Sequence, residues 1–298
     1  MNAKPESPAD FRDNMIEKLK TEGFITDSRV ERAMRTVPRH RFGHWLSLET
    51  VHARGAHPLP GATDATMSTI SDPAAVAIML EPLELLPGQR VLEIGAGTGY
   101  NAALIAELVG ETGHVTAVDI EPYVVVAAKT NLQATGYGRV EVILGDGGFG
   151  FAKNAPYDCI TATVGLWEIP LEWFAQLAHG GRIAAPVHIS GEPYEHVYVV
   201  LEIEGGHLAG RVTSFVNMVL MRGAAGAHSA TPTQALSAEG VTPKTIRVNI
   251  YRRDDANAPA PQALEVTGGR ATKVIEKTHT VIALEIEVQK DTEAGLER

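Results

Sequence analysis

Acidic side chains and glycines occur together at the ends of three apolar runs in the first half of the chain. The first run, residues 91–94 (Val-Leu-Glu-Ile), leads directly into residues 95–99 (Gly-Ala-Gly-Thr-Gly). Glycines in such a turn allow positive φ angles and let the backbone approach a ligand closely. The exposed N–H groups of a following helix suit a polar or anionic group. Five residues here are therefore candidates for ligand binding: Glu93, Gly95, Ala96, Gly97 and Gly99.

The next two apolar runs also end in acids. The second run ends in Asp119, with Ile120 after it, and the third is followed by Asp146 and Gly147. An acid at the end of the second strand can accept both ribose hydroxyls of a nucleoside. A carboxylate after the third strand is placed to meet an adenine amino group. The Gly-x-Gly-x-Gly spacing differs from the Gly-x-Gly-x-x-Gly of dinucleotide dehydrogenases and disfavours a nicotinamide enzyme.

The elements that position these residues alternate between strands and helices. Residues 121–134 and 171–178 have the apolar spacing of helices, and residues 156–163 and 183–187 contain strands. The sequence at 179–182 (His-Gly-Gly-Arg) predicts a turn. This alternation predicts an α/β fold with a parallel, doubly wound sheet. A ligand of such a sheet lies beyond the carboxyl ends of the strands.

Helices are predicted at both 11–22 and 27–35, ahead of residues 95–99, which we call the glycine loop. A further apolar helix covers residues 74–81. It is preceded by Ser71 and Asp72, and either side chain is a suitable helix cap before a proline. Taken locally, these two residues are therefore more typical of a helix N-terminus than of a functional site.

The pattern changes in the last hundred residues. Residues 196–203 and 209–221 indicate longer antiparallel strands, and residues 223–232 resemble a flexible linker. Alternating apolar residues at 246–250 and 282–288 predict half-buried strands. We therefore predict an N-terminal helical segment, a ligand-binding domain and a C-terminal β-rich extension, at residues 1–70, 71–222 and 223–298.

Composition places the protein among ordinary globular chains. Its 298 residues are 44% hydrophobic and carry a net charge of −10, which disfavours a nucleic-acid-coating role. The single cysteine, Cys159, excludes a disulfide within the chain. His40 and His44 lack an accompanying acid, so no metal site is predicted. Neither a signal peptide nor a membrane span is expected, so we predict a cytoplasmic protein without nucleic-acid or membrane partners.

Several strings together resemble the protein-L-isoaspartate O-methyltransferase family over roughly residues 11–222. They occur at the start of that range, in its core and near its end: residues 37–42 (Val-Pro-Arg-His-Arg-Phe), 69–71 (Thr-Ile-Ser) with Pro73, 91–100, 145–147 (Gly-Asp-Gly), 155–158 (Ala-Pro-Tyr-Asp), 180–182 (Gly-Gly-Arg) and 186–187 (Pro-Val). The resemblance implies a class I methyltransferase core, a Rossmann-like sheet. It also implies S-adenosyl-L-methionine as methyl donor and an aspartyl or isoaspartyl carboxylate of a peptide or protein as acceptor.

The resemblance also implies roles for individual residues. Ser71 matches the family's active-site serine, a role that it could combine with capping, and Ser68, Thr69 and Ile70 match a cofactor-contacting stretch. The residues from Glu93 to Gly97 match the cofactor loop, Asp119 the ribose acid, and Asp146-Gly147 the adenine end. A carboxylate acceptor is already ionised at neutral pH, so no general base is needed. Catalysis then depends on alignment and exclusion of water.

Three departures from the family bear on the acceptor. Asp72 follows the serine and adds a negative charge, and residues 163–170 place Val164 and Trp167 where repair enzymes have small residues. We expect these three residues to shape the substrate pocket, although Trp167 is equally typical of a packed core. The extension is the third departure. It resembles that of methyltransferases in peptide natural-product clusters, which methylate an aspartate of a precursor peptide.

Alternative functions remain open at this point. General repair and dedicated peptide tailoring are both compatible with the sequence, and the same scaffold can methylate a peptide nitrogen. A nucleic-acid amino methyltransferase is disfavoured, because residues 161–164 (Thr-Ala-Thr-Val) replace the expected Asn/Asp-Pro-Pro-aromatic string. An inactive protein that binds S-adenosylmethionine is a non-enzymatic alternative. The sequence predicts neither the acceptor peptide nor the oligomeric state.

Overall fold

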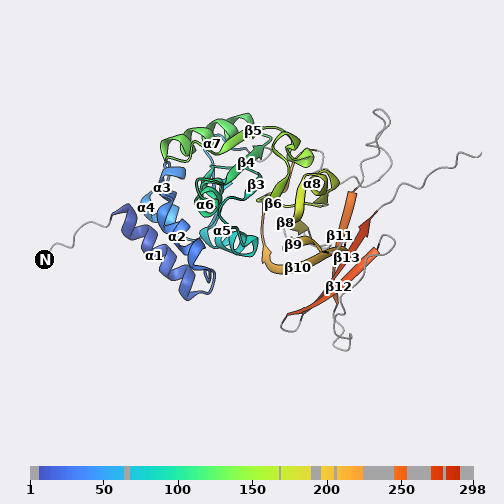
Figure 1. The fold of residues 1–298 in the computed structure, drawn as a ribbon. Coiled ribbons are helices and arrows are strands. Elements are labelled where there is room, and N and C mark those ends of the chain that lie inside the picture. Colours follow the sequence, from blue (N-terminus) through green and yellow to red (C-terminus); the bar gives the residue numbers. More distant parts are fainter. Residues whose placement is uncertain are drawn as a thin grey trace, which may run out of the picture.

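A mixed seven-stranded sheet forms the centre of the computed structural model (Figure 1). The structure describes residues 7–63, 68–167, 169–188, 196–204, 207–223, 245–253, 270–277 and 280–288. The strand order is β10-β9-β8-β6-β3-β4-β5. Its members are β3 Arg90–Ile94, β4 His114–Asp119, β5 Glu141–Leu144, β6 Tyr157–Ala162, β8 Leu177–His188, β9 His196–Glu204 and β10 His207–Val216. In this sheet the five strands β8, β6, β3, β4 and β5 pair in parallel, and β9 and β10 add antiparallel pairs at one edge.

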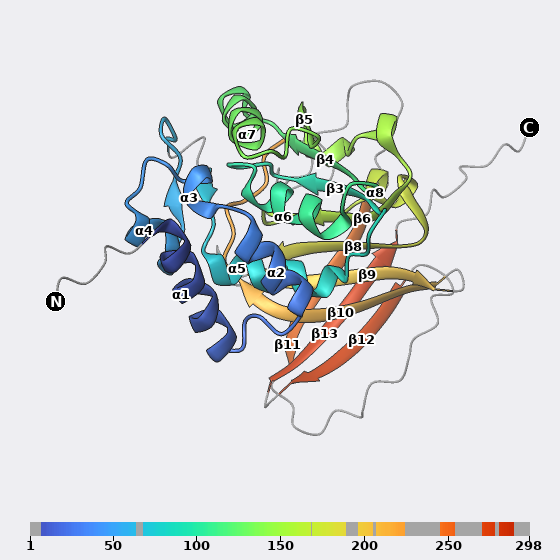
Figure 2. The same ribbon diagram turned by 60° about the vertical axis from the view of Figure 1, so that its left-hand side comes forward.

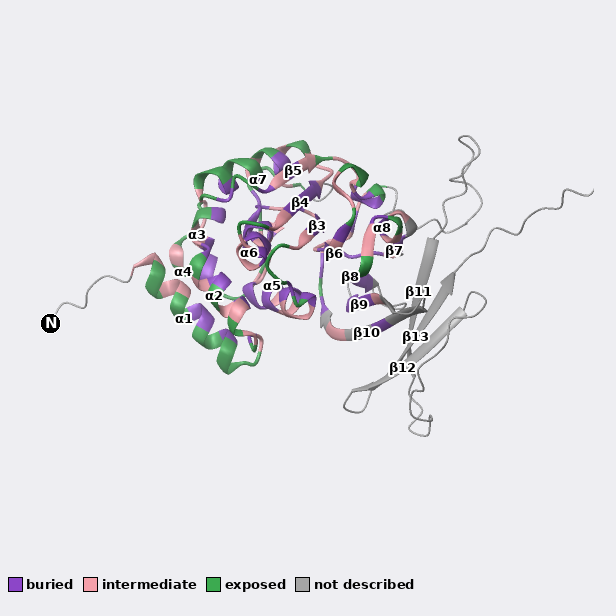
Figure 3. Cartoon of the chain, viewed as in Figure 1, coloured by how far each residue is buried: buried purple, intermediate pink, exposed green. Residues whose placement is uncertain are grey.

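Alternation along the strands builds one core on each face of the sheet. Val91 and Ala117 face a core that includes α5 (Pro73–Leu80) and α6 (Tyr100–Val109), whereas their neighbours Leu92 and Val118 belong to the core that contains Trp173 of α8 (Leu171–Ala175). Strands buried on both faces read as continuous apolar runs, as these do. Figure 3 shows buried residues concentrated in the sheet and on the inner sides of the helices. The doubly wound prediction is confirmed.

Four N-terminal helices pack beside α6, on the side away from β12 (Figures 1 and 2). They are α1 Pro8–Thr21, α2 Ser28–Thr36, α3 Arg39–Phe42 and α4 Leu48–His52, and α7 (Pro122–Ala134) follows β4. Ser7 and Asp10 form a capping box at the start of α1, and the Asp27 side chain caps α2. The helix predicted at 11–22 therefore begins earlier, because the cap lies at Ser7. No helix among the described residues is long and apolar enough to cross a membrane.

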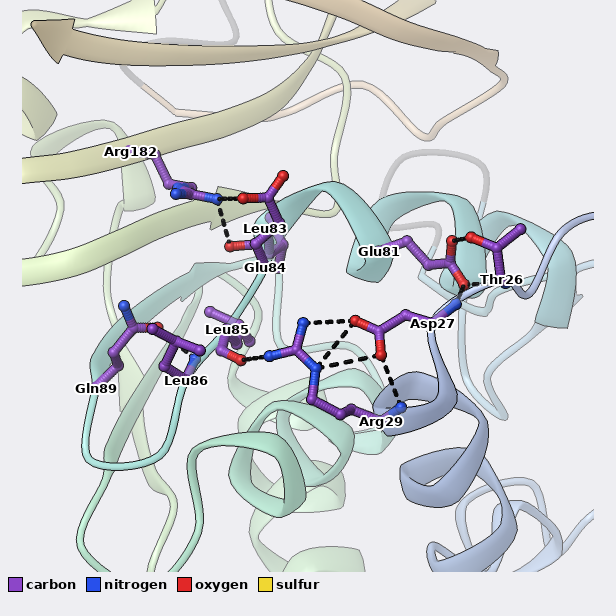
Figure 4. Close-up of polar contacts among 10 residues, drawn as sticks. All are labelled: Thr26, Asp27, Arg29, Glu81, Leu83, Glu84, Leu85, Leu86, Gln89 and Arg182. Carbon is purple, nitrogen blue, oxygen red and sulfur yellow. Dashed lines mark hydrogen bonds and ion pairs between the residues drawn. The ribbon is translucent and has the colours of Figure 1, made fainter.

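The carboxyl end of α5 is tied to its neighbours on two sides (Figure 4). The Glu81 carboxylate, in the 3-10 turn Glu81–Leu83 (η1), accepts hydrogen bonds from the backbone N–H groups of Thr26 and Asp27. On the other side, Arg182 of β8 donates to the Leu83 carbonyl at 3.0 Å. These contacts fix the helix whose amino end begins at Asp72.

Two predicted boundaries near β8 are wrong. The helix predicted at 171–178 ends at Ala175, because Leu177 already pairs with Tyr157 of β6. The turn predicted at 179–182 lies inside β8. The pairing moves from Tyr157↔Leu177 to Cys159↔Arg182, so that residues 178–181 bulge out of register. Gly180 takes a φ of +75° there, which explains the turn-like sequence.

Strands from the C-terminal region form a second, four-stranded sheet in the order β12-β13-β11-β7. They are β7 Ile169–Pro170, β11 Thr245–Arg253, β12 Arg270–Lys277 and β13 Thr280–Val288. The strands predicted at 246–250 and 282–288 are present, whereas β12 was not predicted and most of the linker lies outside the described residues. Since β11 pairs with β7, this sheet includes a piece of the preceding region. The domain boundaries stay a prediction.

Candidate functional site

A cavity of about 700 Å³ opens beyond the carboxyl ends of the parallel strands. Four stretches supply most of its wall: residues 68–72, residues 94–98, residues 118–120 and residues 217–222. The first stretch includes β2 (Thr69–Ile70), which pairs with β1 (His57–Pro58) as a short hairpin. The predicted candidates Ser68, Thr69, Ile70, Ser71 and Asp72 all line the cavity.

The glycine loop forms the floor of the cavity. Gly95 and Gly97 line it with φ angles of +95° and +51°. A Cβ on Gly95 would lie 2.6 Å from the Thr163 Oγ1, so the loop has room only for glycine at that position. Ala96 also lines the cavity. Gly99 is not among the lining residues, and it caps α6 at a φ of +84°.

Asp119 ties the end of β4 to the glycine loop. Its Oδ2 accepts the Gly97 N–H at 3.2 Å, and its Oδ1 accepts the Glu121 N–H at 3.1 Å. Burial raises the pKa of Asp119, and these two backbone hydrogen bonds oppose the shift. Asp119 and Ile120 line the cavity, so this carboxylate is available to a ligand's polar groups.

Glu93 lies behind the cavity wall. It is fully buried, and its Oε1 accepts a hydrogen bond from the Asn101 Nδ2 at 2.7 Å. Burial raises the pKa of Glu93 to about 8, against the opposing effect of the Asn101 contact. Asn101 itself lines the cavity, whereas Glu93 is not among the lining residues. Any influence of this carboxyl group on a ligand is therefore expected to pass through Asn101 and the loop.

Asp146, like Glu93, is not among the residues that line the cavity. The Asp146 Oδ1 accepts the Gly148 N–H at 2.8 Å and caps the short 3-10 turn Gly147–Phe149 (η2). Gly147 lines the cavity, and a Cβ there would lie 2.4 Å from the Ile94 Cγ2. Trp173 of α8 fixes this turn by donating from its Nε1 to the Gly147 carbonyl at 2.9 Å.

Ser71 and Asp72 have different structural roles. The Asp72 side chain caps α5 by accepting the Ala74 N–H at 2.7 Å, so the expectation that Ser71 could also cap this helix is wrong. The backbone carbonyl of Ser71 accepts a hydrogen bond from the Arg39 Nη2 at 2.6 Å. Arg39 is fully buried and lies over the Tyr100 ring at 4.9 Å. This arginine, in the motif at 37–42, therefore fixes the backbone beside the cavity.

Some of the predicted site residues line the cavity, and others lie outside its wall. Val164 lines the cavity, whereas Trp167 is half-buried and is not among the lining residues. The structure thus brings together Ser68 to Asp72, the loop at 95–97, Asp119, Ile120, Gly147 and Val164. Glu93, Gly99, Asp146 and Trp167 are not in the wall, and their roles in binding stay predictions.

Residues 217–222 are the largest part of the wall that the sequence pattern did not reveal. They follow β10 and return across the carboxyl ends of the strands, as the orange segment in Figure 2 shows. Gly165 holds this segment by donating to the Val219 carbonyl and accepting from the Met221 N–H, both at 2.8 Å. The sequence predicted one strand over 209–221, and its predicted end is wrong because β10 ends at Val216. Residues 217–222 were therefore assigned to a strand and not to the cavity wall.

A family model and the relatives of about 40% identity indicate the same family. The family model described as Protein-L-isoaspartate(D-aspartate) O-methyltransferase (PCMT) matches residues 10–219. The chain belongs to this family. It is 42% identical over 193 residues to the Protein-L-isoaspartate O-methyltransferase of Pyrococcus horikoshii, covering 65% of this chain and 84% of the relative. It is 39% identical over 201 residues to that of Methanopyrus kandleri, covering 67% and 86% respectively.

Solved structures confirm the class I methyltransferase fold that the sequence predicted. A protein-L-isoaspartate O-methyltransferase of 31% sequence identity superposes with a TM-score of 0.66, covering 72% of this chain and 67% of that one. A Plasmodium falciparum structure described as a putative member of the same family, in complex with S-adenosyl-L-homocysteine, superposes with a TM-score of 0.61 at 20% identity, covering 71% and 98%. At that identity, the second structure supports the fold alone.

Proposed function

We propose that the protein is an S-adenosylmethionine-dependent protein-L-isoaspartate O-methyltransferase that acts on isoaspartyl residues of peptides or proteins. The observation that carries this proposal is a single cavity in a member of that family. In it, Ser71 lines the wall together with the glycine loop and Asp119. The acceptor side and the cofactor side would thus meet at the carboxyl ends of the strands, where ligands of such sheets bind.

The residues present fit this cofactor. A Cβ on Gly95 would meet Thr163, and both Gly95 and Gly97 line the cavity, so in our proposal the nucleoside and amino-acid groups of the cofactor lie against a loop with no side chains at these two positions. Asp119 and Gly147 both line the cavity, and in our proposal Asp119 accepts the ribose hydroxyls and the adenine packs against Gly147. When bound, S-adenosylmethionine supplies a methyl group on a positively charged sulfur.

The chain's own contribution is alignment. A carboxylate acceptor is ionised at neutral pH, so the protein need not remove a proton from it. In our proposal the Ser71 hydroxyl donates a hydrogen bond to one acceptor oxygen and directs the other toward the methyl group. Arg39 holds the Ser71 backbone, and residues 217–222 form part of the cavity wall. Alignment and exclusion of water are sufficient to accelerate such a displacement substantially.

Radiolabelled S-adenosylmethionine with two matched peptides tests this proposal. One peptide carries isoaspartate, the other aspartate, and both are treated with mild base after the reaction. We expect label on the isoaspartyl peptide alone, released as methanol because esters hydrolyse in base. Base-stable label would show methylation of nitrogen and would contradict carboxyl methylation. Binding of the cofactor without turnover on any peptide would favour the inactive, cofactor-binding alternative.

Dedicated tailoring of a peptide natural product is the second candidate. It is supported by the strands beyond residue 222, which lie outside the family match at 10–219 and join β7 through β11. In that case the acceptor would be an aspartate of one precursor peptide. Label on such a precursor, with none on either synthetic peptide, would favour this candidate over general repair.

A further inference from the structure

Asp72 presents an electrostatic problem for an enzyme whose acceptor is a carboxylate. It follows Ser71 directly, and its residue lines the same cavity. Two negative charges a few ångströms apart repel each other, so an uncompensated Asp72 would weaken binding of the acceptor. Without a compensating cation, the position beside Ser71 would therefore bind a carboxylate poorly.

The structure shows how this charge is compensated. The Arg54 Nε donates to both Asp72 oxygens, at 2.8 and 3.0 Å. The Gly55 N–H donates to Oδ2 and the Ala74 N–H to Oδ1, each at 2.7 Å. One carboxylate thus accepts hydrogen bonds from a guanidinium and two backbone amides, all directed at the same two oxygens. A carboxylate held in this way is turned toward its partners, and the Arg54 cation offsets part of its charge.

Arg54 is itself fixed, although about half of its side chain is exposed. Its Nη1 donates to the Glu22 Oε2 at 2.9 Å, and its guanidinium lies over the Phe24 ring at 4.8 Å. These contacts come from the loop region after α1, so the arginine bridges the N-terminal helices and the amino end of α5. Such a bridge keeps the cation on Asp72 with little loss of side-chain entropy on substrate binding.

We propose that Arg54 is a specificity-determining residue that masks the charge of Asp72 and so lets a carboxylate acceptor bind beside Ser71. The inference rests on the proposed function, since it assumes that the acceptor is a carboxylate. It assigns Arg54 no contact with the reacting atoms. Arg54 acts through Asp72, and the pair replaces the uncharged residue that a carboxylate site would otherwise favour at position 72.

Peptide binding to protein saturated with S-adenosylhomocysteine tests the masking role. The probes are a synthetic isoaspartyl peptide and the same peptide with its acceptor carboxylate converted to a carboxamide. Arg54→Gln is expected to weaken binding of the carboxylate peptide about three- to tenfold, the effect of one like charge near a surface. Binding of the carboxamide peptide and of S-adenosylhomocysteine should stay unchanged. The difference should shrink at 1 M salt, where screening is strong.

Three variants separate charge from structure. Arg54→Lys keeps the cation and should retain most of the affinity. Arg54→Gln combined with Asp72→Asn should restore it, because asparagine caps a helix as well as aspartate does. Arg32→Gln makes the same change in net charge at an exposed position and should have no effect. Equal weakening of both peptides by Arg54→Gln, or no rescue by Asp72→Asn, would overturn the inference.

The same measurements separate this inference from the proposed function. Wild-type protein that binds the isoaspartyl peptide and responds to the variants as expected, yet transfers no methyl group, would refute the activity and support the masking role. Methyl transfer with unchanged KM in Arg54→Gln would support the activity and refute the masking role. Wild-type protein that neither binds nor methylates the peptide would overturn both.

Discussion

Ser71 lines the cavity, while its neighbour Asp72 caps α5. Ser71→Ala should therefore lower kcat about 10- to 100-fold, the effect of one lost hydrogen bond to a charged group. The affinity for S-adenosylhomocysteine and the melting temperature should be nearly unchanged. Steady-state kinetics with an isoaspartyl peptide and calorimetric binding measure both. Wild-type turnover in the variant would refute the positioning role of Ser71.

Asp119 is the acid expected to bind the ribose. Its two oxygens accept backbone N–H groups, so Asp119→Asn keeps the size of the side chain, removes the charge and leaves one of these N–H groups without its acceptor. We expect S-adenosylhomocysteine binding to weaken by about 1–3 kcal/mol, since hydrogen bonds to charged groups are worth that much. Isothermal calorimetry measures the loss, and an unchanged dissociation constant would contradict the assignment.

Glu93 should make stability depend on pH. Its pKa rises from 4.5 to about 8 on folding because burial penalises the charged form, so the folded state holds a proton that the unfolded state releases. The free energy of unfolding is then expected to fall as pH rises from about 5 to 8, by a few kcal/mol. Glu93→Gln keeps the Asn101 contact and should flatten this slope in urea unfolding of the ligand-free protein. An equal slope in wild type and variant would contradict the buried neutral carboxyl group.

At the scale of elements, the turn between β3 and α6 has little freedom to change. Gly95→Ala adds a Cβ 2.6 Å from the Thr163 Oγ1 at a φ of +95°. We expect it to lower stability by about 2–4 kcal/mol, combining backbone strain with overpacking, and to weaken cofactor binding. Gly136→Ala is the matched control, because its φ is +87° and its Cβ would meet nothing within 4 Å. Similar losses of cofactor affinity in both variants would contradict a specific role for the loop.

The cavity wall draws on elements that are distant in the sequence. The strand-turn-helix unit around the glycine loop is local, whereas the wall is completed by β2 and by residues 217–222 after β10. The network at Glu81 and Arg182 holds α5, so that the stretch with Ser71 and Asp72 meets the loop in a fixed position (Figure 4).

At the scale of the whole molecule, no residue of the described cavity wall lies beyond Arg222. A chain that ends at Gly223 should therefore bind S-adenosylhomocysteine within about twofold of the full-length affinity, a change below 0.5 kcal/mol. Among the described residues, this truncation removes the pairing of β11 with β7, at Ile169 and Pro170, and the contacts of β12 with β10. Calorimetry on a folded variant, verified by circular dichroism, measures this, and a tenfold loss would show that the C-terminal sheet supports the site.

The sequence by itself determined the parallel core and the glycine loop at residues 95–99. Strands such as 91–94 are buried on both faces, so their apolar runs are unambiguous, and the glycines at 95 and 97 are required by the local backbone. Asp119 and Asp146 lie at or just after the ends of two of these strands, so their positions at the carboxyl edge of the sheet could also be predicted, because parallel strands end at one edge. These features depend on neighbours in the sequence, which is why pattern alone predicts them.

Only the tertiary structure decided which polar residues face the cavity and what they contact. In the sequence, Asp72 is an extra negative charge without a visible partner. Its partner Arg54 is 18 residues away, and the pairing of β1 with β2 brings the two residues together. Glu93 has the motif of a ligand contact but lies behind the wall, because its strand is buried on both faces. Such pairings depend on packing between distant segments, and no local periodicity encodes them.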